Sequence, residues 1–395
     1  MKNPRIPRGA LVALVGALTL ASCAAAKAAP GSETQTSPEP ASSTTSVTTN
    51  LEWPKTWPVL KAGSDYTVKH LSFKEVNGTR NYPLTWATRT ELLSVGIAPR
   101  GVRAPEVLQV RDVATGKIRS LTSKKGKPRD LTIVGADSDS RWIVWTETTG
   151  NFYSSDWTVF SYDKRTKKTR KLATRPKVGK GDIPSAEGFA VPSIDRGVIY
   201  FDGVWSMANG KPRQAIYSVP ANGSSPAKML IRDAGNPTAD EGRLVYHQRN
   251  KKPIDALFSR DLRTNETVKL DDFQTISKKI ENCGWDWNEG VFVNCRRSSD
   301  GVVTLTVLSP HGRTVVTGKQ ETPWGVWAAK DFVGILRDTG RGYQQRILNL
   351  ETNQLSHVRA QQANTRMWIT GSQYMVTTTD KKGFTNGFDL VRLRF

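Results

Sequence analysis

Short apolar runs recur at nearly equal spacing from about residue 64 to the C-terminus. Each unit has a marker position, often Trp, and an apolar run begins six residues after it. Successive markers are 50, 56, 46, 47, 42 and 41 residues apart. Short runs of this kind, bounded by turn residues, predict β-strands. The seven markers are Trp86, Ala136, Pro192, Thr238, Trp285, Trp327 and Trp368.

Each unit continues in the same way after its first apolar run. A second alternating run follows, then a turn rich in Gly, Asn, Thr or Pro, then a short final run such as TRKLAT or TVKLD. This order predicts four antiparallel strands in about 45 residues, which is the period of a propeller blade. The mature chain shows no convincing helical period. We therefore predict an all-β protein with seven four-stranded blades.

The last unit lacks a fourth strand, because the chain ends with FDLVRLRF. A matching segment, YTVKHLSF over Tyr66–Phe73, precedes the first unit. Pairing the two segments would close the ring and cover an edge, which resembles the strand closure of known β-propellers. A pair of β-sandwiches would also give many short strands, but not seven units in one register. The pattern resembles the TolB-like and WD40-like propellers of exported bacterial proteins, and it covers most of the predicted domain, residues 51–395.

Two cysteines in the fifth unit predict a disulfide. If Asn288–Gly290 form a three-residue connection, Trp285 lies opposite Val293 and Cys283 lies opposite Cys295. Directly opposed residues of an antiparallel pair lie within reach of a disulfide. The alternative is two small buried thiols.

The N-terminus predicts export and a lipid anchor. A basic start is followed by an apolar run of 14 residues, Gly9–Ser22, which is shorter than the about 20 residues of a membrane-spanning helix. Leu20-Ala21-Ser22-Cys23 resembles the lipobox of bacterial lipoproteins. By that resemblance residues 1–22 are a signal peptide, and Cys23 is lipidated and becomes the mature N-terminus on the outer side of the cell membrane. An ordinary secreted protein is the alternative.

Residues 23–50 predict a lipidated N-terminus followed by a disordered tether. Residues 24–50 are rich in Ser, Thr, Pro and Ala and contain no aromatic residue. Such a segment buries too little apolar surface to offset its conformational entropy. The predicted organisation is therefore a signal peptide, a tether and one propeller domain.

The charge of the chain is strongly positive, at +21. Removing the signal peptide takes away three cations and leaves +18. For an exported protein this charge suggests an anionic envelope polymer, an envelope protein or a membrane surface as partner, and no intracellular nucleic acid. Loops between blades and between second and third strands carry +11, whereas turns between first and second strands carry −4. The densest basic loops supply the predicted anion-binding residues Lys124, Lys125, Lys127, Arg129, Arg249, Lys251 and Lys252. The alternative is that these exposed charges only keep a β-rich protein soluble.

Sequence motifs for catalysis are missing. The four His are scattered, and no paired-His metal motif or nucleophile elbow is present. We therefore predict no catalytic residue, metal or cofactor. The sequence favours a membrane-anchored binding or scaffold module. The alternative is an extracytoplasmic propeller hydrolase or lyase that acts on envelope carbohydrate.

Overall fold

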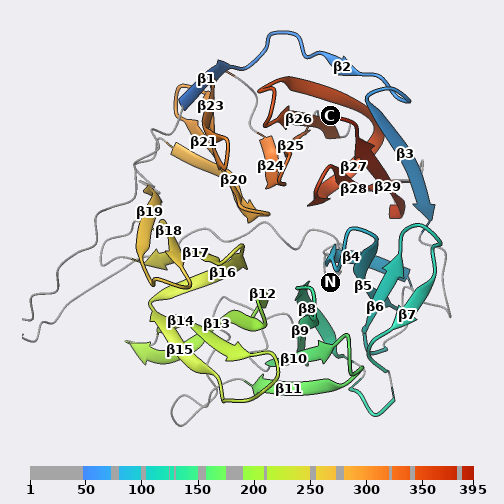
Figure 1. Ribbon diagram of the computed structural model, residues 1–395, viewed down its shortest axis with the longest axis vertical. Coiled ribbons are helices and arrows are strands. Elements are labelled where there is room, and N and C mark those ends of the chain that lie inside the picture. Colours follow the sequence, from blue (N-terminus) through green and yellow to red (C-terminus); the bar gives the residue numbers. More distant parts are fainter. Residues whose placement is uncertain are drawn as a thin grey trace, which may run out of the picture.

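The computed structural model is a ring of β-sheets around a central axis (Figure 1). It describes residues 48–72, 80–98, 104–123, 125–128, 130–149, 157–174, 190–208, 211–249, 255–272, 280–319, 323–338, 343–379 and 385–395. Within these residues the strands form seven antiparallel blades, numbered here in chain order. The predicted seven-bladed propeller is confirmed. Because Cys23 and most of the tether lie outside the described residues, the structure does not test the anchor.

The first four blades each form a separate four-stranded sheet. Blade 1 contains β4 (Arg80–Trp86), β5 (Glu91–Ile97), β6 (Val107–Asp112) and β7 (Ile118–Ser120). Blade 2 contains β8 (Thr132–Ser138), β9 (Trp142–Thr148), β10 (Trp157–Asp163) and β11 (Thr169–Thr174). Blade 3 contains β12 (Ser193–Asp195), β13 (Val198–Ala208), β14 (Lys211–Pro220) and β15 (Lys228–Arg232). Blade 4 contains β16 (Ala234–Asp240), β17 (Arg243–Arg249), β18 (Asp255–Asp261) and β19 (Thr267–Asp272).

Each of the last three blades pairs with one N-terminal strand, and blades 6 and 7 share one long strand, β27. Blade 5 contains β20 (Ile280–Asn288), β21 (Val291–Ser298), β22 (Val302–Ser309) and β23 (Gly312–Lys319). Blade 6 contains β24 (Pro323–Ala328), β25 (Phe332–Asp338), β26 (Tyr343–Asn349) and the first part of β27 (Leu355–Thr370). Blade 7 contains the second part of β27, then β28 (Gln373–Thr379), β29 (Thr385–Leu393) and β3 (Tyr66–Ser72).

Strand β3 closes the ring as the sequence predicts. It pairs antiparallel with β29, from Tyr66 opposite Leu393 to Ser72 opposite Gly387. The N-terminal strand β3 and the last strand, β29, therefore share one blade (Figure 1). Apolar clusters lie between neighbouring blades, and the second strands supply much of each cluster because both of their faces are covered.

Three turns between first and second strands have the same backbone form. Arg196-Gly197, Glu241-Gly242 and Glu289-Gly290 all have positive φ, between 49° and 77°. Two successive residues in this region form the type I′ turn, whose twist matches that of a two-residue hairpin. The turn in blade 5 therefore has two residues, not the predicted three.

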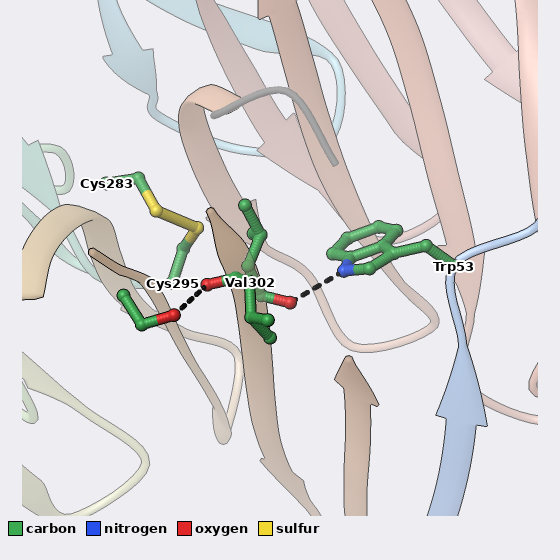
Figure 2. Close-up of a disulfide and its surroundings, with 6 residues drawn as sticks. Trp53, Cys283, Cys295 and Val302 are labelled. Carbon is green, nitrogen blue, oxygen red and sulfur yellow. Dashed lines mark hydrogen bonds between the residues drawn. A yellow bond between two sulfur atoms is a disulfide. The ribbon is translucent and has the colours of Figure 1, made fainter. Parts of the chain in front are cut away.

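The hairpin register in blade 5 corrects the predicted pairing of the cysteines. Trp287 lies opposite Phe292 and Trp285 lies opposite Asn294, one residue away from the prediction. A β-bulge at Cys283 offsets this shift, because it adds one residue to β20 next to Cys295. Cys283 and Cys295 form a disulfide with a Cα–Cα distance of 5.1 Å (Figure 2).

An N-terminal strap, residues 48–60, covers the outer edges of blades 5 and 6 (Figure 1). Its strands β1 (Thr48–Glu52) and β2 (Val59–Leu60) pair in parallel with β23 and β27. This strap was not predicted from the sequence, where residues 48–50 were assigned to the tether. Trp53 of the strap is buried in the same apolar cluster as the disulfide, and its indole N–H donates to the Val303 carbonyl at 2.9 Å (Figure 2).

Candidate functional site

Carboxylates at the turns between first and second strands, which the sequence predicts to be acidic, hydrogen-bond to the next blade. Asp137 Oδ2 of blade 2 accepts from the Ile194 backbone N–H at 2.9 Å. Asp139 Oδ2 accepts from the Gly197 backbone N–H at 2.8 Å. Both donors belong to blade 3. These side chains therefore bind blade 2 to blade 3 and complete backbone hydrogen bonds at the turn.

The same arrangement continues around the ring. In each case a carboxylate oxygen accepts from a backbone N–H of the next blade. Asp195 accepts from Gly242 at 3.0 Å, Asp240 from Gly290 at 3.0 Å, and Asp286 from Ala328 at 2.9 Å. Glu289 reaches two blades, because its carboxylate accepts from the backbone N–H groups of Lys330 at 3.0 Å and of Gly371 at 2.8 Å. We call these residues the inter-blade carboxylates: Asp137, Asp139, Asp195, Asp240, Asp286 and Glu289.

Burial raises the pKa of three inter-blade carboxylates. The pKa of Asp137 rises to about 6 and that of Asp240 to about 7, and burial is the largest cause in both. Burial also raises the pKa of Asp195. Coulomb repulsion adds to the shift, because Asp240 feels the charges of Glu241, Asp137 and Asp195. In the described part of the chain no three His, Cys, Asp or Glu residues are grouped as a metal site would require.

Two further carboxylates join blades away from these turns, Glu106 just before β6 and the buried Asp202 on β13. Glu106 Oε2 of blade 1 accepts from the Ile133 backbone N–H at 2.7 Å, and burial raises its pKa to about 7. Asp202 Oδ2 of blade 3 accepts from the Asn236 backbone N–H at 3.1 Å, and burial raises its pKa to about 6. A raised pKa can mark a reactive group, but each of these carboxylates has a structural partner between blades.

The predicted anion-binding residues are only partly described. Lys125 is exposed. Lys127 is engaged within the protein: its Nζ lies 2.6 Å from Oε2 of the buried Glu147 and 5.1 Å from the centre of the Phe160 ring. Arg249 ends β17, but its side chain is not described. Lys124, Arg129, Lys251 and Lys252 lie outside the described residues, as does Cys23.

The outer edge of blade 2 carries a dense group of exposed cations. The turn and strand from residue 164 to residue 174 contain no acidic residue. The turn is fixed from below by Asp163, whose carboxylate accepts from the Arg165 backbone N–H at 2.8 Å and from Arg141 Nη2 at 2.8 Å. We call the exposed side chains of this edge the blade 2 cations: Arg165, Lys167, Lys168, Arg170 and Lys171.

A pocket of about 230 Å³ lies beside the blade 2 cations, between blades 2 and 3. Three aromatic rings form much of its wall: Trp157 meets Phe201 edge-on at 5.5 Å, and Phe201 stacks on Tyr217 at 5.7 Å, both measured between ring centres. The remaining lining residues are Leu172, Ala173, Thr174 and Ala227. We call this feature the blade 2–3 groove.

The cations of this edge can be recognised in the sequence, whereas the groove cannot. The turn KRTKK is a visible run of charge. The three aromatic residues occupy ordinary strand positions in two different units, and none of them is a repeat marker. Their convergence depends on how blade 2 packs against blade 3, and the spacing of residues along one chain segment cannot show this.

The sequence matches no protein-family model and no curated protein. Solved structures share the fold. An oligogalacturonate lyase in complex with manganese aligns with a TM-score of 0.56 and 10% identity, over 88% of this chain and 99% of that chain. A puromycin-hydrolyzing peptidase of Mycobacterium tuberculosis aligns with a TM-score of 0.51 and 14% identity, over 85% of this chain and 56% of that one.

TolB from Acinetobacter baumannii is also similar, with a TM-score of 0.36 and 12% identity over 78% of this chain and 65% of TolB. At these identities the comparisons show the propeller fold alone. Membership of the TolB-like family therefore stays a prediction. No helix in the described part of the chain is long and apolar enough to cross a membrane.

Proposed function

We propose that this protein is a lipid-anchored, extracytoplasmic binding module whose propeller holds an anionic envelope component or an acidic envelope protein. The anchor is Cys23, and the tether carries the domain away from the membrane surface. A charge of this size attracts anionic partners and speeds their encounter. The disulfide supports a compartment outside the cytoplasm, because such bonds persist in oxidising environments.

The blade 2 cations carry this proposal. Five exposed cations lie within seven residues, with no acidic residue among them to neutralise their charge. The described carboxylates nearer the axis are already hydrogen-bonded between blades. The positive charge therefore stays available on the outer edge of the molecule, and the predicted basic loops add to it.

Binding to isolated cell envelope, across a series of salt concentrations, tests the proposal. The probe protein is the mature chain without its lipid, residues 24–395. One variant reverses four blade 2 cations to Glu (Lys167, Lys168, Arg170 and Lys171), and a second reverses the loop residues Lys124, Lys125, Lys251 and Lys252. A matched control reverses four exposed cations elsewhere: Lys55, Lys61, Arg263 and Lys330.

We expect binding that weakens steeply with salt, because exposed charges are screened over about 8–10 Å at physiological ionic strength. Either the blade 2 variant or the loop variant should weaken binding more than the control, which has the same change in net charge. Equal losses in all three variants would indicate that net charge alone matters and would contradict a defined surface. Absence of binding at low salt would refute the proposal.

A further inference from the structure

The blade 2–3 groove has the size and lining of a receptor for one side chain. Its volume of about 230 Å³ is smaller than the roughly 300–1,000 Å³ of sites for drug-sized ligands. Its walls are three aromatic rings, three aliphatic side chains and one threonine. Rings of this kind pack well against another aromatic group, edge-on or offset.

The groove between blades 5 and 6 shows how such a feature is filled in this fold. There the side chain of Trp53 comes from the strap, outside the four strands of either blade. It donates to the carbonyl of Val303 on the third strand and lies close to Gly318 on the fourth strand. Trp57 follows it, with its ring 5.9 Å from that of Trp53.

The blade 2 wall of the groove uses the corresponding strand positions. In blade 5, Val303 lies opposite Arg297, the seventh residue of the second strand. In blade 2, Trp157 lies opposite Thr148, which is also the seventh residue of the second strand. On the fourth strands, Thr174 of blade 2 corresponds to Thr317 of blade 5. Each lies opposite the third-strand residue that follows Trp157 or Val303. The strap does not extend to this second groove, because its described strands β1 and β2 pair with blades 5 and 6.

The charge around the groove selects the chemistry of an occupant. Arg170 and Lys171 precede its lining residues on β11, and the exposed Lys228 follows Ala227 at the start of β15. These cations favour an occupant that carries negative charge, and the aromatic lining favours one that carries an aromatic ring. The tether of this chain does not fit, because residues 24–47 contain no aromatic side chain.

In blade 5, the strand β1 adds to the edge strand β23. The equivalent addition of a partner strand to β11, the edge strand of blade 2, is disfavoured. Leu172 is an extra residue there, since Val159 lies opposite Ala173 but Phe160 lies opposite Lys171. A bulge of this kind interrupts the ladder and protects an edge strand from regular pairing. The strand β23, which accepts β1, has a continuous register with β22. Binding at the groove must therefore rely on side chains.

We propose that the blade 2–3 groove binds one aromatic side chain of an acidic, extended segment of a partner protein, while carboxylates on either side meet the flanking cations. This inference rests on the proposed binding function and specifies a protein partner for it. The aromatic group provides the anchor in a desolvated pocket, and the charges provide orientation and rate of encounter.

A displayed library of random twelve-residue peptides tests this inference. Peptides are selected on residues 24–395 and counter-selected on Ala173→Phe, which fills the groove. Ala227→Phe on the opposite wall is the second filling variant, in case the first does not fold. Ala114→Phe, at an exposed turn of blade 1, is the matched control.

We expect enriched peptides to contain an aromatic residue flanked by Asp or Glu. Replacing that residue by Ala should weaken binding by about tenfold or more. Either filling variant should do the same, whereas Ala114→Phe should bind as the wild type does. Binding of the original envelope preparation should decrease in the filling variants as well.

Three results would overturn the inference. Enriched peptides that bind both filling variants as tightly as the wild type would exclude the groove. Acidic peptides without an aromatic residue that bind equally well would leave only charge recognition, which is the proposed function without this refinement. A concentration-dependent dimer that is lost in the filling variants would identify a second copy of the chain as the occupant.

Discussion

Replacing Asp240 by Asn should stabilise the propeller near neutral pH and have little effect in acid. Asp240 is the last residue of β16, next to the turn to β17, and its Oδ2 accepts a hydrogen bond from the Gly290 backbone N–H. Asn keeps an acceptor oxygen at this position but carries no charge. The substitution therefore removes a poorly solvated negative charge while the contact between blades 4 and 5 is retained.

The magnitude follows from the pKa of the carboxyl. Burial, followed by repulsion from Glu241, Asp137 and Asp195, raises it from 3.8 to about 7. One pKa unit corresponds to about 1.4 kcal/mol, so the charged form costs at most about 4 kcal/mol. Because the side chain keeps some solvent contact, we expect a gain of about 1–3 kcal/mol in the free energy of unfolding at pH 8.

The sign of the pH dependence is set by linkage. The pKa of Asp240 is higher in the folded state, so the folded protein binds more protons between pH 4 and pH 7. This contribution to stability is complete below about pH 4 and is lost as the pH rises through about 7. Asp240→Asn should remove that loss, and the two proteins should converge in stability at pH 4.

Urea unfolding followed by Trp fluorescence at pH 4, 5, 6, 7 and 8 measures the effect. Asp130→Asn, at an exposed position, is the control and should follow the wild type throughout. If Asp240→Asn lowers the unfolding midpoint at pH 8, the carboxylate contributes more as a charged acceptor than it costs. An equal gain at all pH values would also refute the argument from burial.

Three other substitutions test separate parts of the structure. Replacing Cys283 and Cys295 by Ser should lower the free energy of unfolding by about 2–4 kcal/mol, and added reductant should then have no further effect on urea unfolding. Trp53→Ala should cost about 3–5 kcal/mol through lost burial, and hydrogen exchange should increase first in β1 and β23. Glu289→Ala should cost about 1–3 kcal/mol by leaving amide donors unpaired, and Glu289→Gln should restore part of that loss in the same unfolding assay.

The repeat was readable from the sequence because a blade is a local structure. Six of the seven markers lie in the last residues of a first strand, whereas Pro192 immediately precedes one; the run six residues later lies on the second strand, as Trp86 and Leu92 illustrate. Closure by Tyr66–Ser72 was predictable because the missing fourth strand left one clear candidate. The disulfide was also predicted, although the register was wrong by one residue, since no sequence signal marks the bulge at Cys283.

The candidate site was predictable only in its charge. The run from Arg165 to Lys171 is continuous in sequence, whereas the aromatic rings of the groove come from three strands in two blades. The strap was missed for a related reason. The segment Thr48–Leu60 does not follow the blade repeat. Its strands pair with β23 and β27, which lie about 270 and 300 residues later in the chain.

The positions of the acids and the bases in this protein have different physical consequences. Near the axis, where blades converge, turns leave backbone N–H groups that need acceptors. Inter-blade carboxylates meet that need and are thereby withdrawn from ligands. On the outer edge of blade 2 the carbonyl and amide groups are satisfied within the sheet, and the only carboxylate at the turn, Asp163, is buried beneath it. The exposed cations above it therefore have no partner in their own segment, and for this reason an external anion is expected there and not at the axis.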